Sequence, residues 1–151
     1  MALAAHQYSV GLAITGPSAG AAFVQLLPSS KAVMVRHVSV TITAATATSI
    51  GIIRAATVGT ASTSTAGAAH NPSAPASNAS IVSAWSVAPT ISGSPVYMRR
   101  IVLPATANTT VTWEFNDAPL ISTPTAPLLL WNFGGGAASN ASVTVAWDEA
   151  Q

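Results

Sequence analysis

The segment "KAVMVRHVSVTITAA" (residues 31–45) contains a dense run of β-branched residues, and it decides the fold class. Branched side chains pack well on a pleated sheet, so we predict a long strand from about Ala32 to Thr43. Successive side chains of a strand point to opposite faces. One face carries Met34, Val38, Val40 and Ile42, and the other changes from Val33 and Val35 to Ser39, Thr41 and Thr43. The segment therefore predicts a strand with an apolar face.

Other segments show the same two-residue period. "HQYSVGLAIT" (6–15), "TVTWEFN" (110–116) and "SVTVAWDE" (142–149) alternate as half-buried strands do. "TSIGIIRAA" (48–56) is predicted to be the hairpin partner of the 32–43 strand. Shorter strands are predicted over Phe23–Leu27, Ile81–Ser86, Val96–Leu103, Leu120–Ser122 and Leu128–Phe133. No segment has a sustained helical stripe, so we predict an all-β protein, an antiparallel β-sandwich of jelly-roll or Greek-key type.

Residues 55–80, "AATVGTASTSTAGAAHNPSAPASNAS", contain no charged residue and no aromatic residue. Strands are predicted on both sides of this segment, and each half of the chain has too few strands to close a sandwich by itself. We therefore predict one domain over residues 1–151, with a long ordered loop at about 57–80. A loop of this length is usually functional or held by a neighbour, which is either the same chain or another subunit.

The composition limits the partners of the protein. Charged residues make up 6% of the chain, against about 25% in an average soluble domain. The five basic residues are not clustered, so no nucleic-acid partner is expected. No stretch approaches the about 20 apolar residues of a spanning helix, so no membrane partner is expected. The chain has no cysteine, which fits assembly in a reducing cytosol.

The sequence offers little for catalysis or for a cofactor. It has no G-x-S-x-G elbow, no H-x-H and no H-E-x-x-H spacing. Asp148 and Glu149 are adjacent, so on a strand they point to opposite faces, and we interpret them as solubilising charges. The glycines of "NFGGGAASN" (132–140) follow one predicted strand and precede another, which indicates a wide hairpin loop and not a phosphate site. We therefore expect no enzyme, no metal and no cofactor.

Arg99 and Arg100 lie in the predicted strand "PVYMRRIVLP" (95–104), whose two faces are both largely apolar and carry one guanidinium each. In one interpretation the stems pack along the sheet and the heads reach its edge or pair with Glu114 or Asp117. In the other, the strand meets another protein, because arginine is favoured in interfaces.

The four tryptophans divide into two groups. Trp113 and Trp147 lie on apolar strand faces and are predicted to be core residues. Trp85 and Trp131 fit either the core or an interface, and the sequence leaves both open.

Three charge-free runs (1–30, 55–98 and 118–147) would leave a free monomer with poor colloidal protection, so we expect much of the surface to be covered in an assembly. Four short motifs occur in order: R-A-A-T-x-G-T (54–60), A-W-S-x-A-P-T (84–90), the Arg99–Arg100 strand and the terminal W-D-E (147–149). Over roughly residues 32–149 this succession resembles small β-rich structural proteins of tailed bacteriophages, of the capsid decoration or cement type.

The resemblance implies a structural virion protein. Such a protein would assemble in the host cytoplasm, sit on the outer capsid surface as a homotrimer, and bridge subunits of the major capsid protein. The candidate contact elements are the segment Met1–His6, the loop Thr57–Ser80 and the loop Gly134–Gly136. The candidate interface residues are Met1, Leu3, His6, Arg99, Arg100, Trp131 and Phe133.

Two other classes remain open. A carbohydrate- or receptor-binding module of a phage fibre or tail would expose aromatic residues beside Asp or Asn, and Trp131 with Asn132 is the best such pair. A hydrolase is the third class, in which His37 or Glu114 would have to act.

Overall fold

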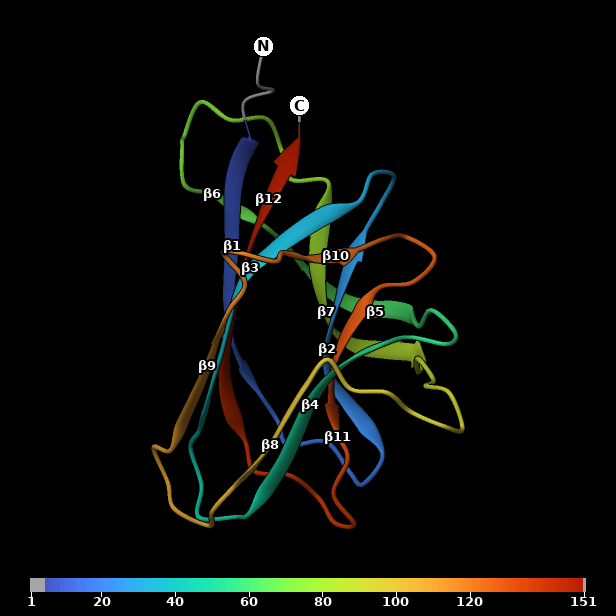
Figure 1. Cartoon of the computed structure of the whole chain (residues 1–151), viewed down its shortest axis with the longest axis vertical. Coiled ribbons are helices and arrows are strands. Elements are labelled where there is room, and N and C mark those ends of the chain that lie inside the picture. Colours follow the sequence, from blue (N-terminus) through green and yellow to red (C-terminus); the bar gives the residue numbers. More distant parts are fainter. Residues whose placement is uncertain (1–4, 151) are drawn as a thin grey trace.

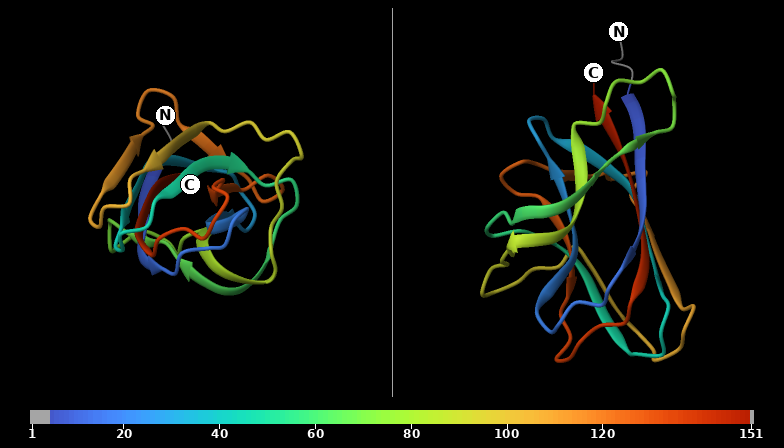
Figure 2. Two further views of the ribbon diagram at one scale, coloured as in Figure 1. Left: turned by 90° about the horizontal axis from the view of Figure 1, so that it is seen from below. Right: turned by 180° about the vertical axis from the view of Figure 1, so that it is seen from behind.

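The structure, a computed structural model, describes residues 5–150, and these form two antiparallel sheets packed face to face (Figure 1). In the first sheet the order is β10 (Leu120–Ser122), β3 (Val33–Ile42), β12 (Ala141–Ala150), β1 (Ala5–Ile14) and β6 (Ala68–Ala69), and β9 (Thr110–Glu114) also pairs with β3. In the second sheet it is β5 (Thr60–Ala66), β7 (Ala79–Val87), β2 (Ala21–Pro28), β11 (Leu128–Asn132), β4 (Thr48–Arg54) and β8 (Arg99–Leu103). Seen from below, the sheets wrap around a common interior (Figure 2). The predicted all-β sandwich is confirmed.

A β-bulge at Arg36 explains the change of face within β3. Trp147 of β12 is paired with Val35, while the preceding Ala146 is paired with His37, so Arg36 is the extra residue. An extra residue shifts the alternation by one position. Val33 and Val35 are therefore buried on the same side as the later residues Val38, Val40 and Ile42.

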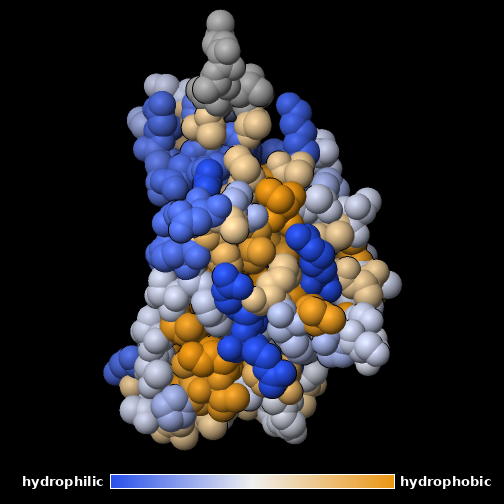
Figure 3. Space-filling view, in the orientation of Figure 1, coloured by the Kyte–Doolittle hydropathy of each residue, from blue (hydrophilic) through white to orange (hydrophobic). Residues whose placement is uncertain are grey.

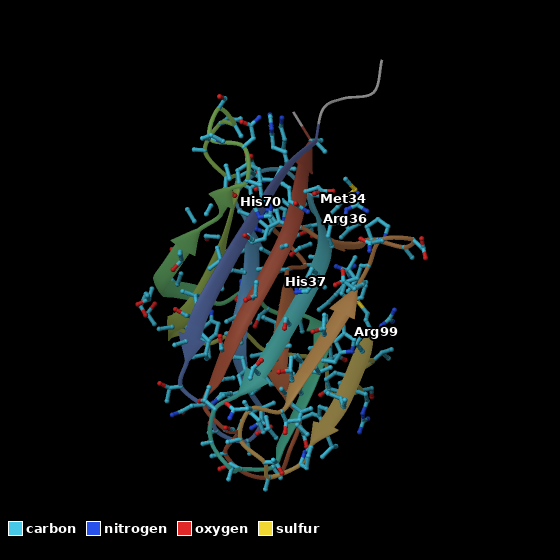
Figure 4. The ribbon with its side chains drawn as sticks, turned by 90° about the vertical axis from the view of Figure 1, so that its left-hand side faces the viewer. Met34, Arg36, His37, His70 and Arg99 are labelled. Atoms are coloured by element: carbon cyan, nitrogen blue, oxygen red, sulfur yellow. The ribbon has the colours of Figure 1, made fainter. Side chains whose placement is uncertain are left out.

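The bulge also corrects the predicted place of Met34. The uninterrupted alternation placed Met34 on the face of Val38, but Met34 is only half-buried and lies on the outer face of the first sheet (Figure 4). Arg36 is anchored from both its side chain and its backbone. Its Nε donates to Asp148 Oδ2 at 2.6 Å, and its carbonyl accepts from the N–H of Phe115 at 2.9 Å.

Consecutive strands cross between the sheets where the sequence suggested hairpins. β3 belongs to the first sheet and β4 to the second, so the predicted hairpin of residues 48–56 with the 32–43 strand is wrong. β4 is buried on both faces and lies between β8 and β11, while β3 is already paired with β12, β9 and β10. The glycine-rich loop after β11 likewise crosses to β12 in the other sheet, so it is not a hairpin loop.

The segment predicted as a loop at about 57–80 contains two strands, and the prediction is wrong over Thr60–Ala66 and Ala68–Ala69. β5 pairs with β7 in the second sheet, and β6 pairs with β1 in the first. Every residue of β5 is exposed, so this edge strand has no apolar face from which to predict it. The segment extends both sheets of the sandwich.

The core lies between the sheets. Trp147 is 0% exposed and Tyr8 is 1% exposed, and their rings stack with centroids 6.5 Å apart. Gly67 makes room for the indole, because a Cβ there would lie 2.5 Å from Trp147 Cζ2. Trp113 is half-buried against the same core. Both predicted core tryptophans therefore pack against the main core.

Glu149 of β12 is a buried carboxylate that joins the two sheets, with 8% of its surface exposed. Its Oε1 accepts hydrogen bonds from the Ser77 hydroxyl at 2.6 Å and from the Trp147 indole N–H at 2.8 Å. Its Oε2 accepts from the Asn78 N–H at 2.8 Å, and Oε1 accepts a longer bond from the Ala79 N–H at 3.3 Å. The carboxylate of the first sheet therefore holds the start of β7 in the second.

Asn78 extends this network to the turn between β2 and β3. Its Oδ1 accepts from the hydroxyls of Ser29 at 2.9 Å and Ser30 at 2.8 Å, and its Nδ2 donates to the Lys31 carbonyl at 2.7 Å. Asp148 and Glu149 do point to opposite faces as predicted. The interpretation of Glu149 as a solubilising charge is wrong, because its position is in phase with the inward-facing Trp147.

Replacement of Glu149 by alanine should lower the free energy of unfolding by about 3 kcal/mol or more, because buried N–H donors lose a charged acceptor. Urea unfolding followed by tryptophan fluorescence measures this. Glu114→Ala is the control, since that side chain is 54% exposed and pairs with His37 at the surface. It should cost less than about 1 kcal/mol. Equal losses in the two variants would contradict the role given to Glu149.

Candidate assembly interface

β8 forms one edge of the second sheet, and apolar side chains are exposed along it and just before it. Within residues 5–150, β8 pairs with β4 alone. Val96 is 82% exposed, Val102 62% and Ile101 36%. Figure 3 shows apolar and strongly hydrophilic side chains side by side on the face of the molecule that carries β8. We call Val96, Arg99, Arg100, Ile101 and Val102 the β8 edge surface.

Arg99 and Arg100 lie on opposite faces of β8, as predicted, and each guanidinium lies against aromatic rings. The Arg99 guanidinium carbon lies 5.3 Å from the centroid of Phe115, the residue that follows β9 of the first sheet. The Arg100 guanidinium carbon lies 4.4 Å from the Phe133 centroid and 5.7 Å from the Tyr97 centroid. Cation–π contacts of this kind hold both heads near the strand.

Within the described residues, no carboxylate forms an ion pair with these arginines. Across residues 5–150 the ion pairs join Arg36 to Asp148 and His37 to Glu114, at 2.6 and 2.7 Å. Glu114 was one of the two acids expected to pair with the arginines. It is engaged by His37 across the β3–β9 pair instead, because these two residues are direct neighbours in the register.

A small apolar cluster on the outer face of the second sheet supports the Arg100 side of the surface. Its buried members are Ala22, Ile53, Ala55, Leu129 and Trp131, and Trp85, Ile91, Tyr97 and Phe133 pack partly buried against them. Trp131 is 6% exposed, so it packs within the chain and offers little surface to a partner. Phe133 remains half-buried and contacts Tyr97 with ring centroids 5.4 Å apart.

Tyr97 and Gly51 were missed from the sequence as parts of this region. A Cβ on Gly51 would lie 2.4 Å from Tyr97 Cδ1. The tyrosine ring therefore packs directly against the backbone of β4 at this glycine. A glycine inside a predicted strand is a known sign of such a close approach. That sign was present in "TSIGIIRAA".

Asn132 is 1% exposed, and its side chain organises the glycine-rich loop. Its Nδ2 donates to the carbonyls of Ser18 at 3.0 Å and Gly136 at 2.9 Å, and its Oδ1 accepts from the Gly134 N–H at 3.0 Å. Trp131 and Asn132, the pair considered for carbohydrate binding, are therefore both engaged within the chain.

The predicted interface residues do not all come together. His6 lies half-buried on β1 of the first sheet, whereas the arginines lie on the edge strand of the second. Met1 and Leu3 lie outside the described residues. The structure brings together Arg100 and Phe133, and it places Arg99 on the opposite face of the same strand.

Several other titratable side chains are engaged outside the β8 edge surface. Ser9 Oγ and His70 Nε2 lie 2.9 Å apart, a pair that the sequence does not predict. Three of the four acids are engaged elsewhere: Glu114 with His37, Asp148 with Arg36, and Glu149 in the inter-sheet network. Over residues 5–150 there is no group of three or more His, Cys, Asp or Glu side chains that would hold a metal ion.

The part of the chain that the structure describes is built of strands, and it contains no helix able to span a membrane. Comparison with protein-family models, with curated proteins and with solved structures gives no match.

Gly51→Ala should displace the Tyr97 ring and lower the free energy of unfolding by about 1–3 kcal/mol, because the new methyl group has no room. Urea unfolding measures the loss, and a red shift of tryptophan emission would report exposure of Trp131. Gly135→Ala is the control, since a Cβ there meets nothing within 4 Å. A stable Gly51→Ala protein with unchanged emission would contradict this packing.

The pKa of Tyr97 is raised above its ordinary value of 10.0 by burial, and the nearby Arg100 partly opposes this. The folded protein thus binds the phenol proton more tightly than the unfolded chain does. This contribution to stability is complete below about pH 10 and is lost as the pH rises above it.

Tyr97→Phe should therefore make the stability fall less steeply above about pH 10 than in the unsubstituted protein. Unfolding midpoints across this alkaline range measure the slope. Tyr8→Phe is the comparison, because burial and the charge of Glu149 raise the pKa of Tyr8 as well. Parallel slopes for all three proteins would argue against the buried phenols as the cause.

Proposed function

We propose that this chain is a structural virion protein, a capsid decoration or cement protein of a tailed-bacteriophage head. It would act as a homotrimer on the outer capsid surface and bridge subunits of the major capsid protein. The observation that supports this best is the β8 edge surface. Exposed valines, and two arginines that have no acidic partner within residues 5–150, lie on or just before an edge strand that is paired on one side alone. The resemblance noted in the sequence adds the virion context.

Exposed apolar side chains along the free side of an edge strand favour a surface that a partner covers. A free edge strand pairs readily with other chains, and proteins that remain monomeric usually protect such edges with charge or bulges. On this edge the charges are Arg99 and Arg100, and Val96 and Val102 remain exposed beside them, so the protection is partial. Contact with a partner would remove Val96 and Val102 from water and give the edge a neighbour.

The opposite edge of the second sheet suits close contact as well. β5 is a run of exposed Thr, Ser and Ala residues. Small side chains lose little rotamer entropy when a surface covers them. Subunits can therefore approach this edge at low cost.

The mechanism would be additive burial. A stable protein interface buries about 800 Å² on each partner, and a decoration protein repeats such contacts many times over a shell. Because one trimer binds several capsid subunits at once, each further contact is effectively intramolecular. Many modest interfaces would then resist expansion of the filled head.

The strand orders support a jelly-roll arrangement of this sandwich. β1, β12, β3 and β9 follow one another in the first sheet, and β2, β11, β4 and β8 in the second. Among these eight strands, consecutive ones lie in opposite sheets except β4 and β8, which are neighbours in the second sheet, as in a rolled-up pair of Greek keys. In this interpretation β5, β6 and β7 are an insertion that widens the β1–β2 side.

The proposal involves neither nucleic acid nor a membrane, and it gives the protein no catalytic role. Five basic residues spread over the chain are too few for a phosphate-binding surface.

The test uses purified protein and phage heads that lack it. We expect a stable trimer in sedimentation, saturation of the heads at a fixed ratio in co-sedimentation, and increased resistance of the heads to heat. A monodisperse monomer that does not co-sediment with the heads would overturn the proposal. Binding of that monomer to a glycan array would then favour the carbohydrate-binding alternative.

A further inference from the structure

We infer that the β8 edge surface binds an extended acidic strand of a partner protein, which would add to the second sheet beyond β8. This inference rests on the proposed function, because it specifies the partner surface that the decoration protein would contact. Main-chain hydrogen bonds would supply the affinity and alternate side chains the specificity, as in other cases of strand addition.

The charge of the surface identifies the chemistry of the partner. Arg99 and Arg100 bring two guanidiniums to one strand, and the ion pairs of residues 5–150 leave both without a carboxylate. Arg99 donates one hydrogen bond, from Nη1 to the Met98 carbonyl at 2.8 Å. A guanidinium has five N–H donors in a planar fork that matches a carboxylate, so both heads retain donors for a partner.

The register of β8 gives the pattern that the partner strand should carry. Arg99 and Ile101 are paired with Ile52 and Ile50, whose side chains point into the core. Arg100 is paired with Gly51, and its guanidinium lies over the rings on the outer face. Each face of β8 therefore presents one arginine followed by one β-branched apolar residue.

All pairs in this sheet are antiparallel, so we expect the added strand to run antiparallel to β8. Its sequence would then place two β-branched apolar residues opposite Val102 and Ile101. Two acidic residues would follow, opposite Arg100 and Arg99. Neighbouring acids on a strand point to opposite faces, which is where the two guanidiniums lie.

A second copy of this chain fits the surface poorly. Of its four acidic side chains, three are held by Arg36, His37 or the inter-sheet network of Glu149. Asp117 remains, and a single acid cannot meet both arginines of another copy. Nucleic acid fits poorly too, because Val96, Ile101 and Val102 flank the arginines and would face phosphates.

The experiment titrates isotope-labelled full-length protein with a capped nine-residue peptide whose central residues are Val-Ile-Glu-Glu. We expect amide shifts concentrated in β8 and β4, and weaker binding as salt is raised. The control peptide carries Val-Ile-Lys-Lys and should not bind. Arg99→Glu and Arg100→Glu should each weaken binding by about tenfold or more.

Lys31→Glu is the matched control variant, because it makes the same change in charge at an exposed site in the turn between β2 and β3. It should bind the acidic peptide as the unsubstituted protein does. Unchanged urea midpoints would confirm that the arginine variants remain folded.

Several outcomes would overturn the inference. These are absence of peptide binding, equal binding of the lysine peptide, or an affinity for the acidic peptide that neither arginine substitution changes. Tighter binding of a single-stranded oligonucleotide at β8 would assign the surface to nucleic acid. Loss of self-association in Arg100→Glu, without peptide binding, would assign it to a second copy.

Heads that lack the protein separate this inference from the proposed function. If the unsubstituted protein and Arg99→Glu/Arg100→Glu saturate heads equally, the proposed function stands and the role of β8 is wrong. If the peptide binds as expected but the heads do not, the strand-binding surface stands and the decoration role is wrong.

Discussion

The bulge at Arg36 is the constraint on which the first sheet depends. β3 pairs with β12 along one side and with β9 and β10 along the other, so its alternation positions most of the sheet. Without an extra residue, either Val33 and Val35 or Val38 and Val40 would point to solvent. The bulge places both pairs in the core, and the ion pair of Arg36 with Asp148 lies beside it.

The buried carboxylate of Glu149 does a second structural task that apolar packing cannot do. Main-chain N–H groups at the start of β7 would be left without acceptors once that segment is covered. The Glu149 carboxylate accepts hydrogen bonds from these N–H groups, and the Asn78 side chain in turn donates to the Lys31 carbonyl in the turn before β3. Of the four acidic residues of the chain, Glu149 is buried, and Asp148 and Glu114 are paired with basic side chains.

This distribution of charge connects the fold to the proposed function. The ion pairs within residues 5–150 do not include the arginines of β8, so positive charge lies beside exposed apolar side chains there. Aromatic rings on both faces hold the guanidiniums near the strand, so less side-chain entropy remains to be lost when a partner binds. A rigid edge of this kind suits an assembly in which each contact is modest and repeated.

The sequence by itself determined the all-β class, the location of most strands and the core role of Trp147, because a two-residue apolar period is a local property. It also placed Arg99 and Arg100 on opposite faces of one strand. Only the tertiary structure decided which strands pair: β4 joins β11 and β8 and not β3, since pairing depends on contacts between distant segments. The tertiary structure also decided that β5 is a strand, because its exposed Thr and Ser residues carry no periodic signal. It decided as well that Trp131 is buried, because the segment before β8 helps to cover it. For Glu149 the sequence determined which face of its strand it occupies. Its hydrogen-bond donors come from residues 77–79, which only the fold brings close to it.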